Sequence, residues 1–127
     1  MNNEPACDLT PAAEPAAPSP GINVKWLAKG TVLLLEGETD LYELTMLYPE
    51  HGIAEITSNH SALRATTIGQ FMHSVQWGQP GIRLDAIRQG WAAVLRFSNG
   101  QFQTQPIASA GVRGTRSDGT HWSYDVF

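Results

Sequence analysis

The segment Ser58–Trp77 (SNHSALRATTIGQFMHSVQW) holds two of the chain's four histidines beside several hydroxyl side chains, so chemistry is sought there first. A metal ion would need further ligands, and His51, Glu55 and His60 lie close together in the sequence. Their spacing matches no zinc or transition-metal pattern. His60 and His73 are not four residues apart, so they cannot chelate as a pair on one helix face. We therefore expect surface histidines and no metal site.

Nucleophiles and paired carboxylates are the next candidates for catalysis. The single cysteine, Cys7, falls in an N-terminal tail where no base is held beside it, and no Gly-x-Ser-x-Gly, P-loop or Gly-x-Gly-x-x-Gly motif is present. Crowded carboxylates repel one another, which favours a solvated acidic face over a glycosidase pair. The candidate acidic face consists of Glu36, Glu38, Asp40 and Glu43. These observations lean away from an enzyme and predict no cofactor.

Arginine and aromatic side chains gather in the C-terminal half of the chain. Arginine neutralises phosphate and an aromatic ring stacks on a base, so the combination is typical of single-stranded nucleic-acid binding. The candidate binding surface consists of Arg96, Arg113, Arg116, His121, Trp122 and Tyr124. The net charge of −4 and the presence of only two lysines argue against nucleic acid.

Length and composition indicate one soluble domain. A chain of 127 residues favours a single domain, and 42% hydrophobic residues are enough for a packed core. Residues 1–21 hold five of the eight prolines, which predicts a disordered Pro/Ala-rich tail before a domain over 22–127. No signal-peptide pattern is present, and no apolar run reaches the roughly 18 residues that span a membrane. We expect a cytoplasmic protein.

Three segments after the tail carry strand patterns. They are Thr31–Glu36 (TVLLLE), Leu41–Tyr48 (LYELTMLY) and Gly52–Thr57 (GIAEIT). The middle segment alternates apolar and polar residues, and short turns join all three. The pattern predicts an antiparallel meander.

The segment Ile68–Trp77 shows a helical pattern instead. Thr67 and Gln70 fit a capping box, and Gly78 followed by Pro80 would end the helix. The apolar residues lie at i, i+3, i+4 and i+7: Ile68, Phe71, Met72 and Val75. We therefore expect one amphipathic helix that covers a face of the sheet, with His73 on its outer side.

Two hairpins are predicted after a segment, residues 81–90, that fits either a strand or a short helix. Asn99-Gly100 would place Phe97 opposite Phe102, following the apolar strand Trp91–Phe97. Asp118-Gly119, taken as a second two-residue turn, would place Arg113 opposite Tyr124 as a cation–π pair.

These elements predict an α+β fold: an antiparallel, twisted sheet of about six to seven strands, with one covering helix, that could close partly into a barrel. The favoured function is a small non-enzymatic protein-binding or regulatory module, whose partner is another protein or a second copy in a homodimer. Nucleic-acid binding by the C-terminal hairpins is the first alternative. A small-ligand or enzymatic site in an aromatic-lined pocket is the second.

Overall fold

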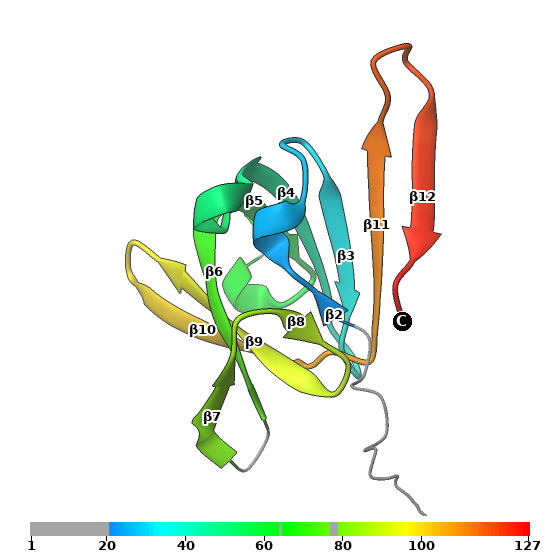
Figure 1. The fold of residues 1–127 in the computed structure, drawn as a ribbon. Coiled ribbons are helices and arrows are strands. Elements are labelled where there is room, and N and C mark those ends of the chain that lie inside the picture. The colour runs from blue at the N-terminus through cyan, green and yellow to red at the C-terminus, as the bar shows by residue number, and fades with distance from the viewer. Residues whose placement is uncertain (1–20, 64, 77–78) are drawn as a thin grey trace, which may run out of the picture.

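A computed structural model describes residues 21–63, 65–76 and 79–127. Nine strands form one antiparallel sheet, in the order β10-β9-β6-β5-β4-β3-β11-β12 with β7 paired to β6, and β2 pairs with β8 in a second, small sheet. Figure 1 shows the strands from β10 to β3 wrapping around a common interior, with β2 and β8 lying across it. The strands are β2 (Gly21–Ile22), β3 (Val32–Glu36), β4 (Leu41–Tyr48), β5 (Ile53–Ser58), β6 (Thr67–Gln76), β7 (Gln79–Leu84), β8 (Ile87–Arg88), β9 (Trp91–Phe97), β10 (Gly100–Pro106), β11 (Ser109–Thr115) and β12 (His121–Asp125).

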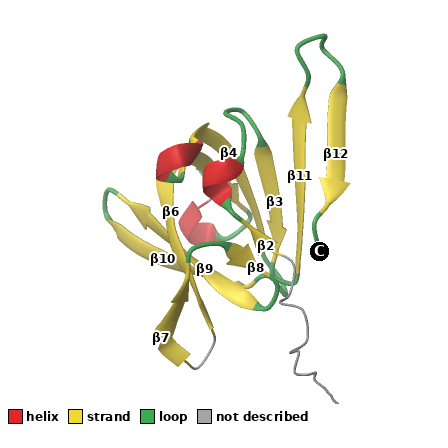
Figure 2. Ribbon diagram, in the orientation of Figure 1, coloured by secondary structure: helices red, strands yellow, loops and turns green. Residues whose placement is uncertain are grey.

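Helix is confined to three short 3₁₀ turns among the described residues. These are η2 (Val24–Trp26), η3 (Pro49–His51) and η4 (Ser61–Leu63). Figure 2 shows them as small red segments among the strands. The expected α+β class is therefore wrong, because the described part of the chain is nearly all β. No helix in that part is long and apolar enough to cross a membrane. The predicted disordered tail lies outside the described residues, except for Gly21.

The predicted meander is present as β3, β4 and β5, paired antiparallel in sequence order. Its alternation predicts the buried face correctly: Tyr42, Leu44 and Met46 are at most 1% exposed. Tyr48 is exposed because the pairing of β4 with β5 shifts between Met46 and Tyr48. Apolar residues at every second position thus face the interior, as the pleat of a strand requires.

The predicted covering helix is a strand, β6. It pairs with β5 through its first half and with β9 from Gln70 onward. The register shifts between Phe71 and His73, and a bulge of this kind reverses the alternation of faces. Phe71 therefore packs in the main core, whereas Met72 and Val75 belong to a separate cluster with Ala92 and Val94. Because of the bulge, apolar residues spaced three and four apart lie on two faces of the strand. The same spacing is expected for one face of a helix.

Gly69 and Gln70 also have roles that differ from those in a helix. A Cβ on Gly69 would lie 2.5 Å from Cε1 of Phe97 and 2.8 Å from Cδ1 of Ile56, so the missing side chain makes room for the aromatic ring. Gln70 does not cap a helix. Its Nε2 donates to the carbonyl oxygen of His51 at 2.8 Å, and its Oε1 accepts from the guanidinium of Arg96 at 2.8 Å.

Both predicted hairpins exist, but each register differs from the prediction. In the first, Gly100 pairs with Phe97, so Ser98 and Asn99 form the turn and Phe102 lies opposite Leu95 rather than Phe97. The shift is two residues, which leaves every side chain on its predicted face. In the second, Arg113 pairs with Ser123, not Tyr124. The predicted cation–π pair between Arg113 and Tyr124 is therefore wrong.

A side-chain clasp joins the end of β10 to the β3–β4 turn. Oε1 of Gln105 accepts from the backbone N–H groups of Thr39 (2.9 Å) and Asp40 (3.1 Å), and its Nε2 donates to Oγ1 of Thr39 at 2.7 Å. The backbone N–H of Gln105 donates to the hydroxyl of Tyr42 at 3.2 Å. In the described part of the chain no backbone ladder joins β10 to β12, the two ends of the strand order. The sheet is therefore open between β10 and β12, and the side chain of Gln105 links the end of β10 to the β3–β4 turn.

Replacing Gln105 with alanine is expected to lower the free energy of unfolding by about 1–2 kcal/mol, because three partly solvated hydrogen bonds are lost. The matched control is Gln103→Ala on the same strand, which is exposed and is expected to cost less than about 0.5 kcal/mol. Urea unfolding of both variants measures the difference. Equal effects at the two positions would show that the clasp does not stabilise the fold.

Ser74 offers a second test of the interior. Its Oγ is fully buried and has no hydrogen-bond partner among the described residues. Thr104 is also buried, but its Oγ1 accepts from the N–H of Ala93 at 2.9 Å and donates to the carbonyl of Gln105 at 2.7 Å. We expect Ser74→Ala to raise the free energy of unfolding by about 1 kcal/mol and Thr104→Val to lower it by about 1–2 kcal/mol. A loss of stability in Ser74→Ala would contradict this assignment.

Candidate functional site

The four predicted acidic residues lie along the β3–β4 hairpin, as expected from their sequence positions. Three of them, Glu36, Glu43 and Asp40, contact neighbouring side chains. Glu36 accepts from the hydroxyl of Ser109 at 2.7 Å, and a carboxylate oxygen of Glu43 lies 3.6 Å from the guanidinium of Arg113. Asp40 accepts from the hydroxyl of Tyr42 at 3.3 Å. Burial raises the pKa of Tyr42, and the nearby charge of Asp40 also raises it, so this hydroxyl keeps its proton. Three of the four carboxylates on this hairpin are thus held by neighbouring side chains.

The candidate Arg/aromatic surface is only partly assembled. Arg96 lies on β9, and the strands β6, β5, β4 and β3 stand between β9 and β11 in the sheet. In Figure 1, β9 runs toward the left of the molecule, whereas β11 rises on the right. The other five residues lie on one hairpin, formed by β11, β12 and the turn between them: Arg113, Arg116, His121, Trp122 and Tyr124. We call this element the β11–β12 hairpin.

A tight turn orders the tip of the β11–β12 hairpin. The N–H of Arg116 donates to the carbonyl of Thr120 at 2.7 Å, and the N–H of Gly119 donates to the carbonyl of Arg116 at 2.9 Å. Gly119 has a φ of +90°, in the region that favours glycine. Thr120 donates to the carboxylate of Asp118 through its hydroxyl and its N–H, and these bonds lower the pKa of Asp118. A three-residue turn replaces the predicted two-residue one and shifts the register by one.

One face of the β11–β12 hairpin carries a stacked aromatic pair. The rings of Trp122 and Tyr124 lie 5.7 Å apart with 24° between their planes. Trp122 packs over Gly114, where a Cβ would come within 2.5 Å of its ring, and also contacts the main core. Tyr124 shares this face with the buried Val112 but is itself 61% exposed. The sheet therefore presents an aromatic surface beside its last strand.

Within the described part of the chain, the outer edge of β12 pairs with no other strand. The N–H of Arg116 donates to Thr120, and the N–H of Val126 donates to the carbonyl of Ala110 at 2.8 Å, so Thr120 and Val126 point their backbone groups toward β11. Alternate residues of an antiparallel strand point the same way, which places Trp122 and Tyr124 in this set. The backbone groups of the residues between them point to the free side: His121, Ser123 and Asp125.

The opposite edge of the sheet, on β10, is less open. Gln105 is held by the β3–β4 turn, and Pro106 has no N–H to donate. The remaining exposed side chains at this edge are the polar Gln101 and Gln103. Lysine, proline and covered segments are common ways to protect an edge strand. β12 contains no lysine and no proline, and none of the described strands pairs with its outer edge.

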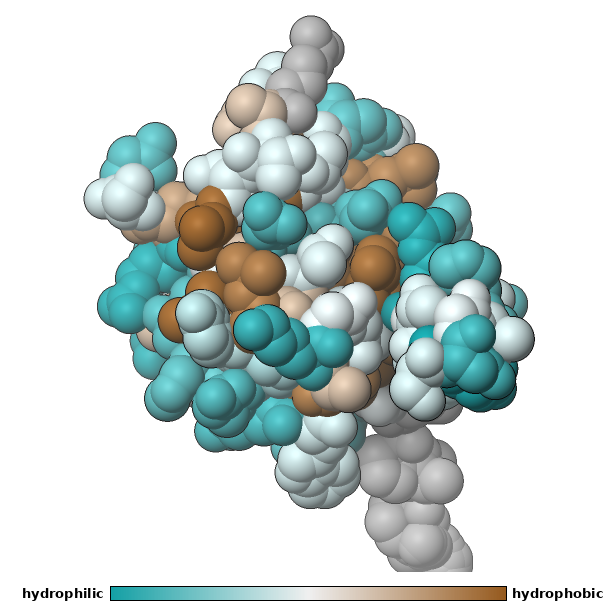
Figure 3. Space-filling model, turned by 90° about the horizontal axis from the view of Figure 1, so that it is seen from above, coloured by the Kyte–Doolittle hydropathy of each residue, from teal (hydrophilic) through white to brown (hydrophobic). Residues whose placement is uncertain are grey.

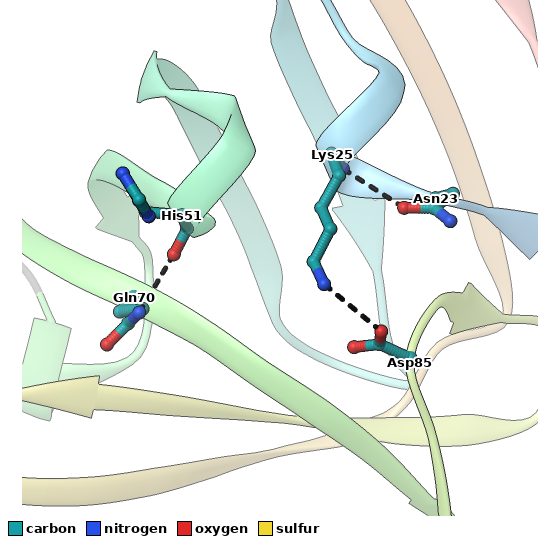
Figure 4. A network of polar contacts seen from close by, with 5 residues as sticks. All are labelled: Asn23, Lys25, His51, Gln70 and Asp85. Carbon is teal, nitrogen blue, oxygen red and sulfur yellow. Dashed lines mark hydrogen bonds and ion pairs between the residues drawn. The ribbon is translucent and has the colours of Figure 1, made fainter.

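A cleft lies between η2, η3, β6 and the segment before β8, and its lining is both polar and apolar. Figure 4 shows Lys25 reaching toward Asp85, with Nζ to Oδ2 at 3.4 Å, while the amide of Gln70 contacts the backbone of His51. Asn23 accepts from the N–H of Lys25 at 3.1 Å. Both charged groups of the ion pair are largely exposed, and the His51 ring points away from them.

In the described ranges, no group of three or more His, Cys, Asp or Glu side chains lies close enough together to hold a metal ion. His60 accepts at Nδ1 from the N–H of Ala62 and packs edge-on against Phe102, with the ring centroids 5.0 Å apart. Burial lowers the pKa of His73, Arg83 lowers it further, and Asp85 opposes the shift. His73 is half-buried on β6 rather than on the outer side of a helix.

Large hydrophobic side chains are also exposed outside the β11–β12 hairpin, among them Trp26, Tyr48 and Ile68. Figure 3 shows, on the face seen from above, small brown groups separated by hydrophilic side chains. The interior is filled mainly by aliphatic side chains from β3, β4, β5 and β9, together with Tyr42 and Phe71. The alternative of an aromatic-lined ligand pocket gains no support from this packing, because two of the large aromatic residues, Trp26 and Tyr124, are 85% and 61% exposed.

Comparison with known proteins gives no match: no family model fits the chain, and no curated protein and no solved structure is significantly similar to it. The function must therefore be argued from the described residues alone. Sequence reasoning named Trp122, Tyr124 and His121 but missed Ser123 and Asp125. The signal that could have found them is the alternation His-Trp-Ser-Tyr-Asp, which places Ser123 and Asp125 on the same face of the strand as His121.

Proposed function

We propose that this chain is a small non-enzymatic protein-binding module that pairs a strand of its partner with the free edge of β12. The observation that carries the proposal is the free edge itself, formed by alternate residues of β12 and flanked by the stacked Trp122 and Tyr124. Strand addition supplies main-chain hydrogen bonds, and side chains on both faces select the partner. Tryptophan and tyrosine are also the residues that most often dominate binding energy at interfaces.

Site-specific photo-crosslinking in cells tests the proposal. A benzoylphenylalanine probe at Tyr124 is expected to capture one partner, and mass spectrometry of the adduct should map the contact to an extended segment. The same probe at Glu50, exposed on η3, is the control position.

The decisive variant is Ser123→Pro. Proline removes an N–H that points to the free side, so it blocks strand addition without breaking a bond to β11. Capture at Tyr124 should be lost in this variant while its thermal unfolding temperature stays close to that of the parent. Capture that survives Ser123→Pro, or no adduct at any β12 position, would contradict strand addition at this edge.

Nucleic-acid binding is the second candidate, and one observation favours it: Arg113, Arg116 and His121 lie on the same hairpin as the aromatic pair. Arg113 is already paired with Glu43, and the chain is acidic overall. Fluorescence anisotropy with labelled single-stranded oligonucleotides decides between them. We expect no binding at physiological salt. Binding that weakens with salt and is lost in Arg113→Gln and Arg116→Gln would favour nucleic acid instead.

A further inference from the structure

We infer that the partner of the β12 edge is a second copy of this chain, paired antiparallel about a two-fold axis at Ser123. The inference rests on the proposed strand addition and names its occupant. In an antiparallel pair, residues whose backbone groups point outward lie opposite outward residues of the other strand. With the axis at Ser123, that residue faces its own copy, and His121 faces Asp125 in both directions.

The side chains of β12 complement themselves in this register. On one face, a histidine of each copy lies opposite an aspartate of the other. Nδ1 of His121 is 3.1 Å from the hydroxyl of Thr115, which leaves Nε2 free to donate to the carboxylate of Asp125 across the axis. Both residues are exposed in the single chain. Oppositely charged or hydrogen-bonded residues directly across two strands stabilise the pairing.

The other face brings the aromatic residues together. Trp122 of one copy falls opposite Tyr124 of the other, in the non-hydrogen-bonded positions where cross-strand side chains lie closest. Each of these rings is already stacked on its neighbour in the same strand, so four rings would form one continuous aromatic row. Such a row would cover the Tyr124 ring, which is 61% exposed in the single chain.

Among residues 21–63, 65–76 and 79–127, no strand lies on the outer side of β12, where a second copy would pair. Figure 1 shows β11 and β12 extending beyond the rest of the sheet, so the free side of β12 faces away from the body of the molecule. The β10 edge lacks the same complementarity, because its exposed side chains are glutamines and its end is occupied by the contact with Thr39. An edge-only contact is small by the standards of stable dimers, so we expect a dissociation constant in about the micromolar range.

The test uses opposite charges on the two-fold axis. Ser123→Lys and Ser123→Glu change an exposed side chain, and each would place two like charges face to face in a homodimer. We expect analytical ultracentrifugation of the purified chain to show a concentration-dependent dimer. Each variant alone should weaken it at least about tenfold, and an equimolar mixture of the two should restore a heterodimer. Gln101→Lys and Gln101→Glu on β10 are the matched controls and should leave the dimer unchanged.

Any one of the following results would overturn the inference. One is a chain that stays monomeric at every concentration. Another is a dimer whose dissociation constant is unchanged by the charges at position 123 or is altered by the charges at position 101. The third is a mixture of Ser123→Lys and Ser123→Glu that fails to associate although both variants are folded. A monomer whose Tyr124 probe captures a different protein would overturn the self-pairing but keep strand addition, whereas a dimer with no adduct on β12 would overturn both.

Discussion

Phe71→Ala is expected to lower the free energy of unfolding by about 3–4 kcal/mol, whereas Ile68→Ala should change it by less than about 0.5 kcal/mol. Phe71 is 7% exposed and packs in the main core, so its removal leaves a cavity. Ile68 is 60% exposed on the same strand. Its side chain loses little contact on truncation. Chemical denaturation of the two variants measures the contrast.

The pair distinguishes a strand from a helix in this segment. In the helix predicted from the sequence, Ile68 and Phe71 occupy the same apolar stripe, so both truncations would be costly. In β6 the two residues lie on either side of Gly69 and Gln70, and only Phe71 points into the core. Similar large losses in both variants would contradict the strand and favour the helix.

Gly52→Ala is expected to cost about 3 kcal/mol for two additive reasons. Gly52 has a φ of +70°, which a residue with a Cβ adopts at a cost of about 1 kcal/mol or more. A Cβ there would also lie 2.8 Å from the backbone carbonyl oxygen of Phe71, and backbone atoms of a paired strand cannot move aside easily. The same glycine accepts from the N–H of Phe71 at 2.8 Å, so the strain falls where β6 joins β5.

Gly90→Ala separates the two contributions. Gly90 has a φ of +84°, but no atom lies within 4 Å of the position that its Cβ would take. This variant should therefore show the conformational cost alone, about 1 kcal/mol. Thermal unfolding of both variants gives the comparison. If Gly52→Ala destabilised the protein no more than Gly90→Ala, this would contradict the close contact between Gly52 and the backbone of Phe71.

The meander and the two hairpins could be predicted because their patterns are local. Alternation in β4 and glycine-containing turns are visible within ten residues of sequence, and they position buried residues such as Leu44 correctly. The pairing registers of the two hairpins could not be predicted in this way. Asp118-Gly119 resembles a two-residue turn, but the carboxylate of Asp118 binds Thr120 and Gly119 takes the left-handed position, which lengthens the turn by one residue.

The nature of β6 could not be predicted because its pattern depends on distant strands. Met72 and Val75 are apolar because Ala92 and Val94 lie beside them on β9, and Gly69 is small because Phe97 covers it. Because of the bulge, the apolar residues of β6 recur at intervals of three and four, which is the pattern expected for a helix. The surface proposed on β12 depends on distant strands as well: its aromatic residues are visible in the sequence, but the position of β12 at the end of the strand order follows from the pairing of β11 with β3.

The return of β11 to β3 has a consequence for how the chain folds. These strands pair Ser109 with Glu36, which are 73 residues apart, whereas β3, β4 and β5 pair with sequence neighbours. Closing so long a loop costs entropy before any contact compensates it, so β11 should dock late. Until β11 pairs with it, the side of β3 that faces away from β4 has no partner strand. Pulse-labelled hydrogen exchange during refolding should protect amides between β4 and β5 earlier than those between β3 and β11.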